Sequence, residues 1–367
     1  MKNIIIAQIG ARHRYEIAKI LHKKSLLKAI YTDSSNFSFF GRLACLFKRF
    51  HPTIKRLSNR QINDIPQTLI KSTDKIFLAD LFRSKTSFKR QNLSNHEVFS
   101  KTAIKWGVKG ADAVYHMYIE NLDFVRYAKS KNLKIITDVY ISPLTEDIMI
   151  KEHQNHPYLK NINYDLDDMK IYKEKIEEAI NLSDVLLCPS NWVAKGVLEV
   201  NPKVKDKIKI VPYGSSISFS DLSNDPVVGR FLFVGYDVPR KGLVYLGKAA
   251  SILKNMNYNI DVRIAGLSRE GELNHEVFRD LNFLGKLEFH QLKEEYTLAD
   301  SFVLPSFSEG LAGVLVEAMS AGLPIISSLN AGIDFSHKEN AYVITPGNDK
   351  EIVEAMLSII DNRVLIE

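Results

Sequence analysis

The chain has 367 residues, 45% of them hydrophobic and 25% charged, which is the composition of a globular protein with room for two ordinary domains. No apolar run reaches the roughly 18 residues that a bilayer-spanning helix needs, and two cysteines are too few for a disulfide framework or a cysteine-built zinc site. The net charge of +6 is uneven, because residues 1–110 hold 22 Lys/Arg against 6 Asp/Glu. We therefore expect this third to meet an anionic partner: membrane lipid, a lipid-linked phosphate or nucleic acid.

The first residues, Met1–Ile9, are predicted to form a buried strand rather than a signal peptide. A tight turn at Gly10–His13 leads into a predicted helix over Arg14–Lys24. In many doubly wound sheets this first turn contacts a phosphate or a sugar. With only two cysteines, Cys45 and Cys188, the chain suits a reducing compartment, so we expect a cytoplasmic protein.

Residues 34–63 contain no acidic residue, and their aromatic and aliphatic side chains from Phe39 to Phe50 follow helical spacing. Two interpretations remain open: a helix in a membrane interface, where each basic residue gains about 1 kcal/mol from anionic lipid, or a core helix with a solvated basic rim. The basic field continues toward Arg90, which favours the membrane, and no nucleic-acid module is recognisable. The cations that would meet the membrane or an acceptor are Arg42, Lys48, Arg49, Lys55 and Arg56.

Two further strands are predicted at Ala113–Met117 and Lys134–Tyr140, with a helix at Leu122–Ser130 between them. This alternation predicts a parallel sheet covered on both faces. His116 and Asp138 fall at the carboxyl ends of these strands, where open α/β sheets bind ligands. Each is either a substrate contact or an ordinary structural residue.

The polar stretch Glu146–Glu178 is predicted to be helical. Its acidic tetrad Asp165–Asp168 is better explained as a helix start that favours negative charge than as a metal site. A strand at Asp184–Ser190, a helix from Asn191 and a strand at Lys207–Gly214 complete a first domain over residues 1–214. The polar run 215–225 is the predicted linker, and 226–367 is the second domain.

The second domain repeats the pattern, with a strand at Arg230–Gly235 and a helix at Leu243–Leu253. The loop between them carries Arg240 and Lys241, two cations that can neutralise a diphosphate leaving group. Surface Arg-Lys pairs are also common without such a role. Further predicted strands follow, with a closing helix over Glu351–Asp361. The strands lie at Asp261–Gly266, Asn282–Leu287, Ser301–Pro305, Ile325–Ser328 and Tyr342–Gly347.

The stretch around Glu309 and Glu317 has the richest chemistry. A loop with small residues leads into a predicted helix at Leu311–Met319, and open amides at a helix start form a phosphate seat. A carboxylate one turn into the helix can accept hydrogen bonds from a ribose diol, and one before the helix can meet a sugar hydroxyl or a developing positive charge. These parts suit a nucleotide sugar, whereas the alternative is a βα unit with two exposed glutamates.

The string EGLAGVLVEAMSAGLP, Glu309–Pro324, closely resembles the signature of the family 4 retaining glycosyltransferases. FVG followed by RKG, Phe233–Gly242, resembles the diphosphate-binding loop of the same family. The resemblance implies a GT-B-like α/β fold, with two Rossmann-like doubly wound domains facing across a cleft. It also implies retention of the anomeric configuration and no metal or other cofactor.

The resemblance assigns roles to individual residues. Glu309 would face the donor sugar and Glu317 the ribose, while Lys241 and Arg240 would neutralise the diphosphate. The remaining donor contacts would be Gly10, Gly235, Leu284, Gly285, Gly310, Leu311, Ala312 and Gly313. The family often has a histidine where this chain has Thr137 and Asp138, so His116 from the neighbouring strand is the alternative, and Tyr236 stands where an arginine is usual.

The sequence thus predicts a metal-independent hexosyltransferase that moves a sugar from a nucleoside-diphosphate sugar to a saccharide acceptor. The expected acceptor is lipid-linked or a precursor of a surface polysaccharide or lipopolysaccharide. The expected partners are the donor, the acceptor and an anionic membrane surface at the inner face of the cytoplasmic membrane, without nucleic acid. Two alternatives remain: a nucleotide-sugar epimerase or phosphorylase on the same frame, and a non-catalytic carbohydrate- or lipid-binding protein.

Overall fold

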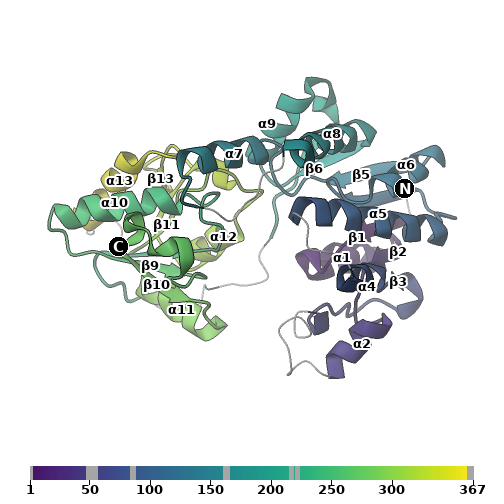
Figure 1. Ribbon diagram of the computed structural model, residues 1–367, viewed down its shortest axis with the longest axis horizontal. Coiled ribbons are helices and arrows are strands. Elements are labelled where there is room, and N and C mark those ends of the chain that lie inside the picture. The colour runs from purple at the N-terminus through teal and green to yellow at the C-terminus, as the bar shows by residue number, and fades with distance from the viewer. Residues whose placement is uncertain are drawn as a thin grey trace. The chain divides into compact units, whose positions relative to one another are not determined.

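The computed structural model describes residues 3–46, 57–82, 88–159, 166–214, 219 and 224–361, and it divides into two compact units (Figure 1). Unit 1 comprises Met1–Val139, Tyr164–Leu187 and Val200–Lys209, and unit 2 comprises Tyr140–Asn163, Cys188–Glu199 and Ile210–Glu367. Two segments of the predicted first domain, 140–163 and 188–199, therefore pack with unit 2. The boundaries drawn at 214 and 226 stay predictions.

The first sheet has seven strands in the order β3-β2-β1-β4-β5-β6-β7. Its strands are β1 (Ile4–Gln8), β2 (Leu27–Thr32), β3 (Ile70–Ser72), β4 (Ala113–Met117), β5 (Lys134–Asp138), β6 (Val185–Cys188) and β7 (Ile208–Ile210). The helices described between residues 1 and 214 are α1 (Glu16–Lys23), α2 (Phe39–Leu46), α4 (Lys75–Phe82), α5 (Phe88–Trp106), α6 (Leu122–Ser130), α7 (Thr145–Asn155), α8 (Leu166–Leu182) and α9 (Asn191–Val200). The central strands β1 and β4 are buried along their whole length, as is usual in a parallel sheet with helices on both faces.

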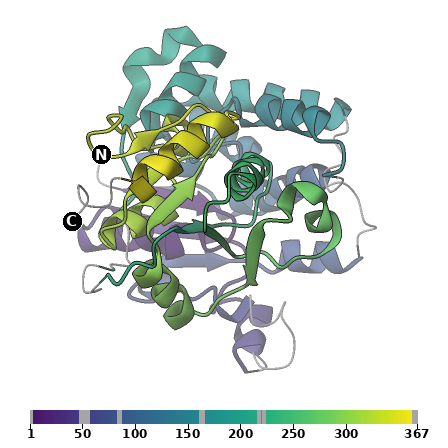
Figure 2. The ribbon, with the colours of Figure 1, turned by 90° about the vertical axis from the view of Figure 1, so that its left-hand side faces the viewer.

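The second sheet has six strands in the order β10-β9-β8-β11-β12-β13. Its strands are β8 (Arg230–Val234), β9 (Asp261–Ala265), β10 (Leu281–Gly285), β11 (Ser301–Leu304), β12 (Ile325–Ser327) and β13 (Tyr342–Val343). The helices are α10 (Leu243–Asn255), α11 (Phe289–Leu298), α12 (Gly313–Ser320) and α13 (Asp349–Asp361). Helices α10 and α13 pack against each other, and Figure 2 shows α13 in yellow.

Both sheets are parallel and reverse their strand order once, β1 beside β4 in the first and β8 beside β11 in the second. This is the order of a doubly wound fold, in which ligands bind at the carboxyl ends of the strands where the order reverses. The predicted α/β class with two Rossmann-like domains is confirmed. The loops after β8 and β11 are therefore neighbours, and these loops carry most of the predicted donor site.

Three predicted elements differ from the structure. The helix expected over Glu146–Glu178 is wrong: α7 ends at Asn155, where Tyr158 and Leu159 turn into the core of unit 2, and α8 begins only at Leu166. The first helix begins at Glu16 rather than Arg14, because His13, Arg14 and Tyr15 have positive φ angles and the turn buries the Tyr15 ring. The strand expected up to Gly214 ends at Ile210.

Among the described residues, no helix is long and apolar enough to cross a membrane.

Candidate functional site

The reversal point of the second sheet brings two loops together. The Arg240 loop, residues 235–242, follows β8, and the Glu309 loop, residues 305–312, follows β11. The backbone N–H of Phe307 donates to the carbonyl oxygen of Arg240 at 2.8 Å, which joins the loops directly. The two predicted cations and the predicted sugar-facing carboxylate thus meet at one site.

Glu309 forms ion pairs with both cations. Lys241 Nζ lies 2.9 Å from Glu309 Oε1, and Arg240 Nη1 lies 2.5 Å from Glu309 Oε2. Glu309 and Lys241 are only 8% and 7% exposed. Arg240 also donates to Asp237 through Nε at 2.7 Å, and through Nη1 to the carbonyl oxygen of Ser308 at 3.0 Å. The cluster contains two positive and two negative groups, held in a mostly buried setting.

The electrostatics favour the ionised forms of Glu309 and Arg240. Burial alone would raise the pKa of Glu309, but the neighbouring Lys241 and Arg240 outweigh burial and hold this pKa below its usual range. Burial likewise opposes the charge of Arg240, but Glu309 and Asp237 outweigh it and raise the arginine's pKa. Because Glu309 already pairs with both cations, a diphosphate that bound Arg240 and Lys241 would have to share them with this carboxylate.

Two glycines allow the Arg240 loop to pack this closely. A Cβ on Gly235 would lie 2.4 Å from Cδ of Lys241, so the lysine stem runs over the bare backbone. Gly242 has φ +71°, and a Cβ there would lie 2.2 Å from the carbonyl oxygen of Pro305. Any larger residue would displace either the lysine or the Glu309 loop.

The predicted phosphate seat, Gly310 to Gly313, lies at the start of α12. Ala312 is the N-cap, and its N–H donates to the carbonyl oxygen of Ala331 at 3.0 Å. The N–H groups of Gly313 and Val314 open the helix and have no helical acceptor, as at any helix start. Gly313 is exposed, and a Cβ there would meet nothing within 4 Å. The open N–H groups at this end of α12 are therefore those of Gly313 and Val314.

Glu317 lies one turn into α12 and is half-buried. Tyr296 of α11 donates its hydroxyl to Glu317 Oε2 at 3.1 Å. Burial raises the pKa of Glu317, and the Tyr296 hydrogen bond counteracts this only in part. The carboxylate keeps its second oxygen for a diol, which fits the predicted ribose role.

Leu284 and Gly285, two of the predicted donor contacts, end β10. The N–H of Gly285 donates to Leu267 O at 2.9 Å, and its carbonyl oxygen accepts from Gly266 N at 2.8 Å. Both backbone groups of Gly285 are thus used to join β9 and β10. Leu284 is half-buried against the core of unit 2.

Three predicted site residues, Gly10, His116 and Asp138, lie in unit 1. The N–H of Gly10 donates to Asp33 Oδ1 at 2.8 Å. Asp138 is 3% exposed and accepts a hydrogen bond from the Tyr115 hydroxyl, with His13 Nε2 at 4.0 Å.

His116 is fully buried in the interior of unit 1. Its Nδ1 lies 3.1 Å from the carbonyl oxygen of Glu120, and its Nε2 lies 2.7 Å from Oγ1 of Thr137 on the paired strand β5. Burial lowers the pKa of His116 to about 4. This environment favours the structural interpretation of the residue.

Of the cations predicted to meet a membrane or acceptor, Arg42 is exposed on α2. Phe39 and Leu43, one turn apart on the same helix, are 72% and 40% exposed. Lys48, Arg49, Lys55 and Arg56 lie outside the described residues, as do Asp165 and most of the predicted linker.

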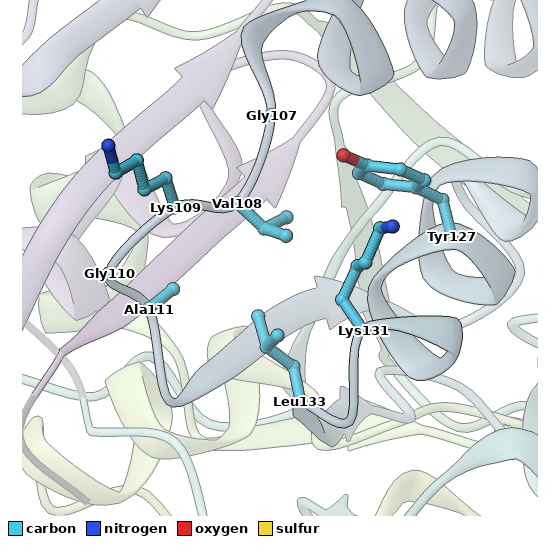
Figure 3. Close-up of a pocket in the computed structure, with 8 residues that line it drawn as sticks. All are labelled: Gly107, Val108, Lys109, Gly110, Ala111, Tyr127, Lys131 and Leu133. Carbon is cyan, nitrogen blue, oxygen red and sulfur yellow. The ribbon is translucent and has the colours of Figure 1, made fainter.

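A pocket of about 420 Å³ lies in unit 1, among the loops that precede β4 and β5. Figure 3 shows Tyr127 and Lys131 side by side on one wall, with Lys109 pointing away from them. The pocket lies at the amino ends of the strands, opposite the edge of the sheet that carries Gly10 and Asp138. None of its lining residues is a predicted site residue. Within the described part of the chain, no group of three or more His, Cys, Asp and Glu side chains could hold a metal ion.

Residues 223–367 match the model of the family described as Glycosyl transferases group 1. Over these residues, which are less than half of the chain, the protein is similar to the group 1 glycosyltransferases. It is 27% identical over 172 residues to a phosphatidyl-myo-inositol mannosyltransferase of Mycobacterium leprae, a match that covers 43% of this chain and 45% of that one. The chain spans about half the length, or less, of the curated relatives that it matches.

Two solved structures share the fold of this chain. Sucrose-phosphate synthase from Thermosynechococcus elongatus matches with a TM-score of 0.63 at 14% identity, over 99% of this chain and 91% of that one. Anabaena HepE, solved in complex with UDP-glucose, matches with a TM-score of 0.57 at 14% identity, over 99% and 90%. At this identity the likeness establishes the fold alone.

Sequence reasoning missed the residues that support the Glu309 loop. Asp237, next to the cations, could have been found as an acid three positions before Arg240, a usual spacing for an ion pair in a turn. Asn330, whose carbonyl oxygen accepts from Glu309 N at 2.9 Å, gave no local signal. Thr145, Ser190 and Trp192 are distant in sequence from the loop that they contact.

The first prediction concerns the balance of charge around Glu309. Glu309→Gln leaves Arg240 and Lys241 with one carboxylate instead of two, so the site should bind a diphosphate more tightly. We expect pyrophosphate affinity at low salt to rise on the order of threefold to tenfold, measured by titration calorimetry. Glu295→Gln is the matched control, because Glu295 is also 8% exposed and pairs with an arginine, Arg263. Unchanged or weaker binding in Glu309→Gln alone would contradict the expectation.

The second prediction concerns Glu317 and pH. Because its folded pKa is raised above the ordinary value of 4.5, ionisation of Glu317 costs stability once the pH rises through that pKa. Glu317→Gln should therefore raise the melting temperature at pH 7 by about 2 °C. The difference should disappear below pH 4.5, where the wild-type carboxyl is protonated in both states.

Differential scanning fluorimetry from pH 4 to 8 would follow this difference. Glu354→Gln, at an exposed position of α13, should show no such pH-dependent gain. A Glu317→Gln variant that melts below the wild type at pH 7 would show that the ionised carboxylate stabilises the fold, contrary to this account.

Proposed function

We propose that this protein is a glycosyltransferase that transfers a sugar, with retention of anomeric configuration, from a nucleoside-diphosphate sugar to a saccharide acceptor. The observation that carries the proposal is the buried pairing of Glu309 with Arg240 and Lys241, beside the start of α12. Two oriented cations and open helix amides suit a diphosphate, and fixed charges of this kind stabilise a leaving group without reorganisation. Glu317 would bind the ribose.

The proposed reaction breaks the bond between the anomeric carbon and the diphosphate oxygen, and forms a bond from that carbon to an acceptor hydroxyl on the same face of the sugar. The acceptor's proton passes to the departing diphosphate oxygen. Arg240 and Lys241 would neutralise the negative charge that grows on the diphosphate, which is work that other transferases give to a metal ion. Glu309 would then give up part of its ion pairing with the two cations and contact the donor sugar instead.

We assign the acceptor to the class of lipid-linked or cell-surface saccharides. This assignment is supported by the basic excess of residues 1–110 and by the exposed apolar side chains beside Arg42 on α2. One relative by sequence is a phosphatidyl-myo-inositol mannosyltransferase, and one structural neighbour, WaaG, is described as a glycosyltransferase involved in lipopolysaccharide biosynthesis. The proposal includes peripheral contact with an anionic membrane surface.

The third prediction tests the reaction. Proton NMR should follow α-linked UDP-, GDP- and ADP-sugars in the presence of octyl glycosides as acceptor mimics, and again without acceptor. We expect one donor to be consumed in an acceptor-dependent way, giving an α-linked product. A β-linked product would overturn retention. Conversion of the donor sugar to its epimer without acceptor would identify an epimerase, and donor binding without any turnover would identify a non-catalytic protein.

The fourth prediction tests membrane contact. The double variant Phe39→Ser/Leu43→Ser should weaken binding to phosphatidylglycerol-containing vesicles on the order of tenfold at low salt, because it removes two apolar side chains from the interface. Vesicle sedimentation would measure the change. The control is Phe289→Ser, at a 56% exposed position of α11 in unit 2. Equal binding by wild type and both variants, or no binding by the wild type, would remove the membrane from the proposal.

A further inference from the structure

The side chain of Ser308, directly before Glu309, is held by two residues that lie more than 100 positions earlier in the sequence, Thr145 and Trp192. Ser308 is 0% exposed. Trp192 of α9 donates its indole N–H to Ser308 Oγ at 3.1 Å. Thr145, the first residue of α7, has its Oγ1 2.8 Å from the same oxygen.

These contacts form a hydrogen-bond chain with one direction. The Thr145 hydroxyl donates to the carbonyl oxygen of Ser142 at 2.7 Å, so its oxygen accepts the proton of Ser308. Ser308 Oγ in turn accepts from the indole of Trp192, which can only donate. Each hydroxyl in the chain thus donates once and accepts once, and the arrangement fixes the Ser308 rotamer.

The other side of Glu309 is held in a similar way. The Ser190 hydroxyl, just before α9, donates to the carbonyl oxygen of Gly310 at 2.6 Å. A Cβ on Gly310 would lie 1.9 Å from the carbonyl oxygen of Tyr140, so the backbones are in direct contact. Glu309 therefore lies between two residues whose positions depend on segments 140–159 and 188–199.

The contacts also reach Arg240. The carbonyl oxygen of Ser308 accepts from Arg240 Nη1, the same nitrogen that pairs with Glu309. A rotation of the Ser308 peptide would thus move the carboxylate and one of its two cations together. Misplacement of a reacting group by about 1 Å can cost on the order of 100-fold in rate.

We propose that Trp192 and Thr145 are positioning residues that set the geometry of Glu309 and Arg240 through the side chain of Ser308. They touch neither donor nor acceptor in this account. The inference rests on the proposed transferase function. It adds that the positions of Glu309 and Arg240 depend on two segments, 140–159 and 188–199. These segments follow strands β5 and β6 of the first sheet but pack in unit 2.

The test compares variants that remove one hydrogen bond each. Trp192→Phe keeps an aromatic ring without the N–H, and Thr145→Val keeps the shape without the hydroxyl. Each should lower kcat about tenfold and leave the donor KM within about twofold. Thr145→Ser retains the hydroxyl and should retain most of the activity. A purely structural role would instead lower the melting temperature and leave kcat per folded molecule unchanged.

The matched control for Ser308→Ala is Ser301→Ala. Ser301 is also 0% exposed and donates to a backbone carbonyl, that of Pro324, but it lies at the opposite end of β11. Ser308→Ala should lose kcat, and Ser301→Ala should not.

A second readout does not depend on activity. The chain has two tryptophans, Trp106 and Trp192, so a ¹⁵N-labelled sample should give two indole N–H signals. In Ser308→Ala the Trp192 signal should shift and exchange faster with water, while that of Trp106 stays in place. If the wild type transfers no sugar, the proposed function fails and this inference falls with it. If the wild type is active and Trp192→Phe, Thr145→Val and Ser308→Ala match Ser301→Ala in kcat, only the inference is overturned.

Discussion

A single buried carboxylate shared by two cations is the constraint on which the C-terminal unit depends. Taking Glu309, Arg240 and Lys241 out of water carries a large desolvation cost, which only their mutual pairing offsets. Loss of one partner from such a group typically costs about 3–5 kcal/mol. The two loops that carry these residues must therefore stay in register, and this holds the loop geometry ready before any donor binds.

The surrounding backbone is shaped to make that pairing possible. The reversal of strand order places the ends of β8 and β11 side by side. Gly235 and Gly242 then let the Arg240 loop approach closer than any side chain would permit, and Gly310 does the same for the Glu309 loop. The site thus depends as much on missing side chains as on charged ones. Segments 140–159 and 188–199, which precede the predicted second domain in the sequence, supply the remaining hydrogen bonds to the Glu309 loop.

The fold and the two central loops of the candidate site could be predicted from the sequence because both depend on local patterns. Alternating strands and helices predicted two doubly wound sheets, and the short motifs around Lys241 and Glu309 marked two loops that the topology brings together. Contacts between distant positions were beyond reach: nothing near Thr145 or Trp192 signals a bond to Ser308. The continuous helix over Glu146–Glu178 was wrong for a related reason, since the burial of Tyr158 and Leu159 in unit 2 overrides the local preference. His116 had a suitable position at a strand end, but its burial could not be foreseen from position alone.

The central claim is that Lys241 and Arg240 neutralise the donor's diphosphate, and titration calorimetry of UDP, GDP and ADP tests it most directly. Lys241→Met keeps the stem that packs on Gly235 and removes the charge, while Lys254→Met removes an exposed lysine from the end of α10. We predict that one nucleotide binds the wild type and Lys254→Met equally, and binds Lys241→Met at least about tenfold more weakly. Equal affinity for all three proteins would contradict the account.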